Sequence, residues 1–158
     1  MAGSSKKVAT RHWLMKSEPD CFSIEHLRKK RTSGWDGVRN YQARNFMREM
    51  ALGDRVLFYH SNAKPPGIAG LAEVCALAHP DPTQFDPASE YYDPKATPTA
   101  PRWQMVDVRY VATFSRFLPL EQLHLIPELS GMVLLQRSRL SVQPVSQAHY
   151  DLIVSLVT

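Results

Sequence analysis

The spacing of the apolar segments is the feature that most limits how this chain can fold. Five segments have the apolar or alternating pattern of β-strands, and they lie at residues 12–16, 54–61, 68–77, 102–114 and 140–145. Helix-forming sequence separates some of these segments but not others. A regular parallel array needs a crossover helix between successive strands, so this pattern argues against one. The spacing predicts a mixed α+β fold around a curved sheet.

Capping residues indicate where the helices begin and end. Ser23 is expected to cap a helix that follows it, and Ser146 is expected to cap a final helix. After Tyr41, apolar residues recur at the i, i+3, i+4 and i+7 spacing of one buried helix face. Asn40 is placed to cap this helix, and Gly53 is expected to end it in a left-handed conformation.

A long irregular loop is expected before the fourth strand. Residues 80–101 hold six of the twelve prolines and four acidic residues. Loops of this length usually carry a function or are disordered. The aromatic residues Phe85, Tyr91 and Tyr92 predict that this loop packs against the domain.

Composition excludes several classes of protein. With 158 residues, 44% apolar, the chain is predicted to form a single globular domain over 12–158 after a flexible polar tail at 1–11. No apolar run is long enough to span a membrane, and we expect an intracellular protein, cytoplasmic or, in a eukaryote, nuclear. Cys21 and Cys75 match no metal or redox spacing, which predicts reduced, buried thiols. The histidines are scattered and no cofactor motif is present, so neither a metal nor a cofactor is expected.

Charge is distributed unevenly along the chain. The net charge is +4, and residues 1–60 carry twelve Lys and Arg against six Asp and Glu. A basic half is typical of proteins that bind an anionic partner, nucleic acid first. A modestly basic surface without such a partner explains the charge equally well.

One stretch, WDGVRNYQARN at 35–45, combines residue types suited to nucleotide binding. Trp35 offers a ring on which a base can stack, and the amides of Asn40 and Asn45 can pair with a base edge. Arg39 lies next to a predicted helix N-terminus, where anions bind. The stretch therefore predicts recognition of an unstacked nucleotide. A packed tryptophan beside ordinary capping residues would account for the same spacing.

Longer motifs resemble those of the EVE domain family. They read HWLMKSEP, WDGVRNYQARNFMR, GDRVLFYHS, PGIAGLAEV, DPTQFDPASEYYDP, PRWQMVDV and RLSVQPV, in the family's order. The resemblance implies a PUA-like fold, a curved, barrel-like mixed sheet surrounded by helices, related to YTH and ASCH domains. It also implies a non-enzymatic module with a pocket for a single modified base flipped out of the helix. Modified cytosine in DNA is the leading candidate.

The resemblance further implies which residues bind the nucleic acid. The base-binding residues would be Trp13, Ser17, Trp35, Val38, Asn40, Tyr59, His60, Ser61, Leu140 and Ser141. The phosphate-binding residues would be Lys16, Arg39 and Arg44. In this arrangement Trp35 stacks on the base and Asn40 reads its exocyclic group, while Ser17 or Ser61 bonds to its edge.

Two other functions stay open on the sequence alone. Because RNA and DNA phosphates attract lysine equally, a reader of modified RNA fits the same charge pattern. An enzyme acting on a nucleotide-like small molecule is the second, with Lys16, His60 and Ser61 as its polar group. Adjacent residues on a strand point to opposite faces, so His60 and Ser61 cooperate only if the strand has ended. The oligomeric state is not indicated.

Overall fold

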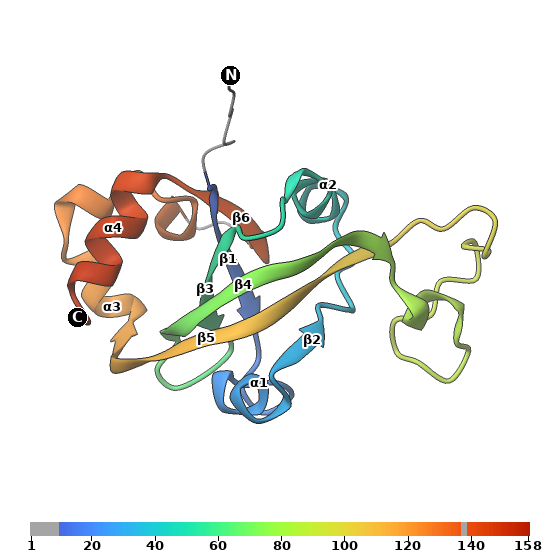
Figure 1. The fold of residues 1–158 in the computed structure, drawn as a ribbon, viewed down its shortest axis with the longest axis horizontal. Coiled ribbons are helices and arrows are strands. Elements are labelled where there is room, and N and C mark those ends of the chain that lie inside the picture. The colour runs from blue at the N-terminus through green and yellow to red at the C-terminus, as the bar shows by residue number, and fades with distance from the viewer. Residues whose placement is uncertain (1–9, 137–138) are drawn as a thin grey trace, which may run out of the picture.

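The computed structural model describes residues 10–136 and 139–158, which form one six-stranded sheet with helices around it (Figure 1). The strands are β1 (His12–Ser17), β2 (Thr32–Gly34), β3 (Arg55–His60), β4 (Gly67–Pro80), β5 (Gln104–Pro119) and β6 (Val142–Val145). The α-helices are α1 (Ile24–Lys30), α2 (Tyr41–Glu49), α3 (Leu120–His124) and α4 (Gln147–Ser155). Short 3-10 turns lie at Pro82–Phe85, Pro127–Leu129 and Val133–Gln136. The predicted tail at 1–11 falls almost entirely outside the described residues.

The sheet is mixed, as predicted, and it is curved but not closed. Its strand order is β2-β5-β4-β3-β1-β6, and β1 runs parallel to β3 while the other neighbours are antiparallel. The two end strands of this order do not pair with each other, so the described strands form no complete barrel. Register shifts between β4 and β5 let the two long strands bend. A Cβ at Gly67 or Gly70 would overlap a carbonyl oxygen of β5, which explains the glycines in this strand.

Strand alternation divides the core into two apolar clusters, one on each face of the sheet. Trp13 of β1 and Phe58 of β3 belong to the cluster that α1 and α2 cover. Leu14, Leu57 and Tyr59 belong to the other cluster, which residues of α3 and α4 complete. Figure 1 shows α3 and α4 together at one end of the long β4–β5 pair.

The predicted helix caps are confirmed at the N-terminal ends. The side-chain oxygens of Ser23, Asn40 and Ser146 each accept a backbone N–H of the first turn of α1, α2 and α4. The prediction for the end of α2 is wrong. Met50 ends that helix in an extended conformation, and Gly53, with φ +90°, belongs to the turn that leads into β3.

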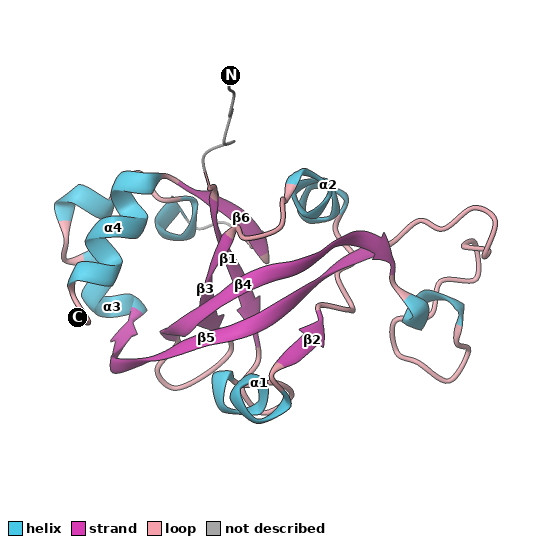
Figure 2. Ribbon diagram, viewed as in Figure 1, coloured by secondary structure: helices cyan, strands magenta, loops and turns pink. Residues whose placement is uncertain are grey.

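The irregular loop at residues 81–103, here called the β4–β5 loop, lies at one end of the β4–β5 strand pair (Figure 2). Buried polar contacts help to hold it. Gln84 is fully buried, and its amide nitrogen donates to the carbonyls of Asp81 and Trp103 at 2.7 Å each. Its oxygen accepts two backbone N–H groups just before β5. Tyr91 and Tyr92 remain 37% and 41% exposed. Phe85 is partly buried, so the three aromatic residues on which the sequence prediction rested are only partly covered.

Both cysteines are free and exposed, so the prediction of buried thiols is wrong. Cys21 lies on the turn before α1, and Cys75 lies on a β4 position that is not covered. Among the described residues, no helix has the length and apolar content needed to cross a bilayer.

Candidate nucleic-acid interface

A cavity of about 990 Å³ lies where the ends of three strands meet. Its volume is at the upper end of the range, roughly 300–1,000 Å³, found for small-molecule sites. The lining comes from the end of β1 and the turn after it, Lys30 at the end of α1, residues 33–39, Ser61 after β3, the β4–β5 loop, Met105 of β5 and the segment before β6. Backbone hydrogen bonds bring these pieces together. The Ser61 N–H donates to the Ser17 carbonyl, and the Lys16 N–H donates to the Ser141 carbonyl, both at 2.9 Å.

Seven of the sequence-predicted residues line this cavity. They are Lys16, Ser17, Trp35, Val38, Arg39, Ser61 and Ser141. Because β1 lies between β3 and β6 in the sheet, motifs far apart in the chain meet at one corner. Burial lowers the pKa of the Lys16 ammonium, which is consistent with a half-buried position in the wall.

Trp13 and Tyr59 lie away from the cavity, which corrects their predicted base-binding role. Trp13 shares a sheet face with Ser17, but at about 3.3 Å per residue it is roughly 13 Å further back along β1. It is fully buried, and its indole N–H donates to the Asp54 carboxylate at 2.9 Å. Tyr59 belongs to the apolar cluster on the opposite face of the sheet.

Asn40 and His60 also fail to line the cavity, because each holds the start of a helix. The Asn40 side-chain oxygen accepts the N–H of Ala43 at 2.9 Å. His60 Nε2 accepts the N–H of Ile24 at 3.1 Å. Burial lowers the pKa of His60, so the ring stays neutral and acts as an acceptor.

Two further predicted residues lie outside the cavity. Leu140 packs beside the apolar cluster under α1 and α2. Arg44 projects from α2, where its guanidinium lies 4.8 Å from the Tyr41 ring and donates to the Arg102 carbonyl at 2.8 Å. It therefore reaches a surface next to the β4–β5 loop instead of the cavity wall.

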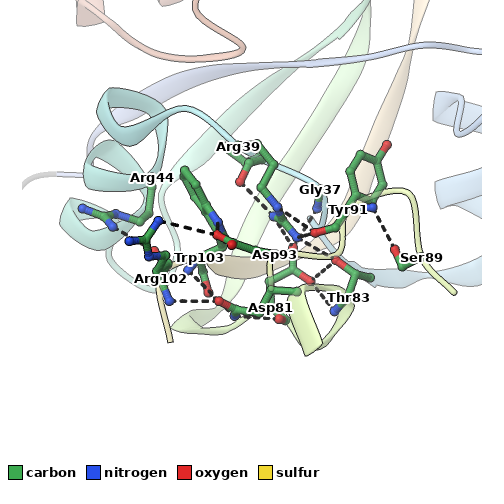
Figure 3. A network of polar contacts seen from close by, with 12 residues as sticks. Gly37, Arg39, Arg44, Asp81, Thr83, Ser89, Tyr91, Asp93, Arg102 and Trp103 are labelled. Atoms are coloured by element: carbon green, nitrogen blue, oxygen red, sulfur yellow. Dashed lines mark hydrogen bonds and ion pairs between the residues drawn. The ribbon is translucent and has the colours of Figure 1, made fainter. Parts of the chain in front are cut away.

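Arg39 does line the cavity, but its guanidinium is already hydrogen-bonded to other groups of the protein (Figure 3). It donates five hydrogen bonds, to the carbonyl of Tyr91 twice, the hydroxyl of Thr83, the carbonyl of Val38 and the carboxylate of Asp81, at 2.8–3.1 Å. A guanidinium has no further N–H donors. These contacts contradict the predicted phosphate role of Arg39. Its role is to fasten the β4–β5 loop to the segment before α2.

Asp81 is the buried centre of this network. Its carboxylate accepts the Gly37 N–H at 2.8 Å, the Thr83 N–H at 2.8 Å and the Thr83 hydroxyl at 2.6 Å, besides Arg39. Burial alone raises the pKa of Asp81, but the bonds from Thr83, Gly37 and Arg39 outweigh it and hold the pKa below its usual value. The loop is thus tied down by an ionised carboxylate.

Three aromatic side chains, Phe22, Trp35 and Tyr91, line the cavity. Trp35 is only 7% exposed and meets the Phe58 ring edge-on at a centroid distance of 5.3 Å. It is therefore part of the core as well as of the wall. Tyr91 lies directly against Gly37, where an added Cβ would be 2.7 Å from the ring Cζ. Gly37 has φ +80°, so both its conformation and the ring require glycine there.

Sequence reasoning missed Tyr91 and several charged lining residues. The charged ones are Glu18, Lys30, Asp36, Glu90 and Arg139. The aromatic content of the β4–β5 loop was the available signal for Tyr91. No local pattern indicates that a loop residue lies beside a stretch more than fifty positions earlier, as the Arg39–Tyr91 hydrogen bonds show.

The charged lining contains both cations and carboxylates. Lys30 and Arg139 are exposed cations, whereas Lys16 is partly buried, with its Nζ 5.8 Å from the centroid of the Tyr59 ring. Glu18 and Glu90 are exposed carboxylates of the same lining. Asp36 brings a carboxylate whose pKa is raised by partial loss of hydration and by the nearby Asp81. Among the described residues, no group of three or more His, Cys, Asp or Glu side chains is arranged to hold a metal.

Comparison with known proteins gives a consistent result. A model of the EVE domain matches residues 11–156. Thymocyte nuclear protein 1 of Homo sapiens is 47% identical over 169 residues, which cover 95% of this chain and 75% of that protein. The structure of a hypothetical protein from Leishmania major is 55% identical, with a TM-score of 0.91, covering 94% of both chains. The structure of human THYN1 protein in complex with 5-methylcytosine containing DNA is 47% identical, with a TM-score of 0.90, covering 93% of this chain and 97% of that one.

Proposed function

The chain belongs to the EVE domain family, and on that premise we propose that it binds DNA and recognises a modified cytosine flipped into the cavity. The observation that carries the proposal is the cavity itself, which lies at the junction of β1, β3 and β6 and has aromatic, hydroxyl and cationic lining. A relative with the same fold was solved with DNA that contains 5-methylcytosine. No catalytic step is part of the proposal.

The aromatic and apolar lining suits a flat base. Trp35 and Tyr91 supply ring surface, and stacking on such rings contributes about 1–3 kcal/mol per base. Val38 supplies apolar surface for a methyl group. Ser61 and Ser141 supply hydroxyls that can donate to ring nitrogen or carbonyl oxygen. Since one methyl adds little apolar area, we expect roughly tenfold preference for methylated over plain cytosine.

The phosphate contacts are assigned to cations among the lining residues. Lys16, Lys30 and Arg139 line the cavity, and the two exposed ones are placed to meet the strand on either side of the flipped base. Arg44 on α2 stays a predicted outer phosphate contact. These contacts position the DNA without reading its sequence.

The enzymatic alternative has weaker support than the binding function. The Nε2 atom of His60 already accepts a backbone N–H, so this atom cannot act as a general base for Ser61. The same cavity would also suit a modified base in RNA, so experiment must distinguish the RNA reader from the DNA reader. A DNA-binding role also favours an intracellular location, nuclear in a eukaryotic cell.

Fluorescence anisotropy with matched oligonucleotides tests the proposal. The set consists of one sequence as duplex DNA with cytosine, 5-methylcytosine or 5-hydroxymethylcytosine at one position, and the same sequence as RNA. We expect the tightest binding for DNA with a modified cytosine. Equally weak binding of every oligonucleotide would refute the proposal, and tightest binding of modified RNA would replace it with the RNA reader. Mass spectrometry of the recovered oligonucleotides checks for turnover.

A further inference from the structure

The polar side chains that line the cavity differ in how much of their hydrogen-bonding capacity the protein already uses. Arg39 donates all of its N–H groups within the protein. The Ser17 hydroxyl donates to the Phe22 carbonyl at 2.6 Å, and the Ser33 hydroxyl donates to the Gly34 carbonyl at 3.1 Å. Asp36 differs from these. Among the described residues, its carboxylate is hydrogen-bonded only by its own backbone N–H and forms no ion pair.

The position of Asp36 is held from both sides. The N–H of Trp35 donates to the Val106 carbonyl of β5 at 2.8 Å. The N–H of Gly37 donates to the buried Asp81 at 2.8 Å. The backbone that carries the Asp36 side chain is therefore attached to the sheet and to the β4–β5 loop. A carboxylate carried on a fixed backbone, beside Trp35 in the cavity lining, is well suited to contact a bound base.

Nearby charged groups act on the protonation of the Asp36 carboxyl in opposite directions. Lys30 and Arg39 favour its ionised form, whereas loss of hydration and Asp81 oppose it. An ionised carboxylate has acceptor oxygens and no donor. The natural partner for it in a nucleobase is an exocyclic amino group, since carboxylates accept from cytosine N4.

We propose that the Asp36 carboxylate accepts a hydrogen bond from the exocyclic amino group of the flipped base and so selects modified cytosine against thymine. This inference rests on the proposed function. Thymine and 5-methylcytosine carry the same methyl group, so apolar contact cannot separate them. They differ at position 4, where cytosine has an amino donor and thymine a carbonyl acceptor. Thymine would place its carbonyl oxygen against the carboxylate and leave Asp36 without a partner.

The test compares 5-methylcytosine with thymine in otherwise identical duplexes, each placed opposite an abasic site so that neither base is paired. For the wild-type chain we expect 5-methylcytosine to bind at least about tenfold more tightly, the scale of one hydrogen bond to a charged group. In Asp36→Asn the side-chain amide can turn to present a donor or an acceptor. We expect the ratio of the two affinities to fall close to one, mainly because thymine binds better.

Asp151→Asn is the matched control. Asp151 is an exposed residue of α4, outside the cavity lining, and the substitution makes the same change in charge. Its affinity ratio should equal that of the wild type, and thermal unfolding should show that both variants are folded. An improved affinity for thymine in Asp36→Asn alone is a result that mere loss of structure does not produce.

The outcomes separate the inference from the proposed function. If the wild type prefers 5-methylcytosine to plain cytosine but binds thymine equally well, the role of Asp36 is refuted and the proposed function stands. If Asp36→Asn keeps the wild-type ratio, the selection lies elsewhere and the inference is also wrong. Failure of the wild type to prefer modified DNA over unmodified DNA overturns both.

Discussion

Replacing Arg39 with alanine distinguishes a structural role from a phosphate-binding role. The substitution removes four hydrogen bonds from the segment before α2 to the β4–β5 loop, and a fifth to the carbonyl of the adjacent Val38. Breaking a buried ion pair costs about 3–5 kcal/mol. Asp81 keeps its three bonds from Gly37 and Thr83, and the Arg39 side chain is 21% exposed, so we expect a smaller loss of about 2–3 kcal/mol in the free energy of unfolding.

Two measurements are needed on the same variant. Urea denaturation gives the free energy of unfolding, and since domains are stable by about 5–15 kcal/mol, Arg39→Ala should still fold. The salt dependence of DNA affinity then reports phosphate contacts, with a slope of about −0.9 per contact. We expect the slope of Arg39→Ala to equal the wild-type slope, although its affinity falls because the loop that carries Tyr91 is loosened.

Lys30→Ala is the matched control and should show the opposite pattern. Lys30 is exposed, lines the cavity and has one weak contact, with the Ser33 hydroxyl at 3.5 Å. Its removal should change stability by less than about 0.5 kcal/mol and reduce the salt slope by about 0.9. Full stability of Arg39→Ala together with a reduced slope would refute the structural role. Arg39→Lys should also have a lower free energy of unfolding than the wild type, since an ammonium cannot reproduce the planar fork of a guanidinium.

Three further variants test individual features of the site. Gly37→Ala should lose about 1–3 kcal/mol of stability and some DNA affinity, because a Cβ meets Tyr91 at a positive φ; thermal unfolding and anisotropy measure the two effects. Trp35→Ala should lose about 3–5 kcal/mol in urea denaturation as well as modified-base binding; an unchanged stability would show that the ring is not part of the core. Burial lowers the pKa of His60, so wild-type stability should decline as the pH falls below about 6.5, where the unfolded chain takes up the proton first. His60→Gln, which has no titrating group, should show a smaller decline between about pH 7.5 and about pH 5 in the same assay.

Local features of the structure were predictable because local sequence produces them. The caps at Ser23, Asn40 and Ser146 depend on a side chain and a backbone N–H that are three residues apart. The interior position of β3 followed from apolar residues on both of its faces. The longer motifs predicted the family, and the match over residues 11–156 confirms it.

The incorrect site predictions for Arg39 and Trp13 depended on the tertiary structure. Arg39 was predicted to bind phosphate because it lies beside a helix start, yet its partners Asp81, Thr83 and Tyr91 lie more than forty residues along the chain. Trp13 was assigned to the pocket through its motif, whereas its distance along β1 places it in the core. Strand spacing could have signalled the error for Trp13, but no local pattern could have done so for Arg39.

The amino-acid sequence by itself determined five of the six strands, the capped helices and the EVE domain framework, since periodicity and capping act over a few residues. Only the tertiary structure decided which polar groups of the cavity lining can still bond to a ligand and which are already hydrogen-bonded within the protein. The reason is that hydrogen-bonding capacity is limited. Arg39 has no donor left for a ligand, while Asp36, three positions earlier, keeps its carboxylate without a partner residue in the described chain.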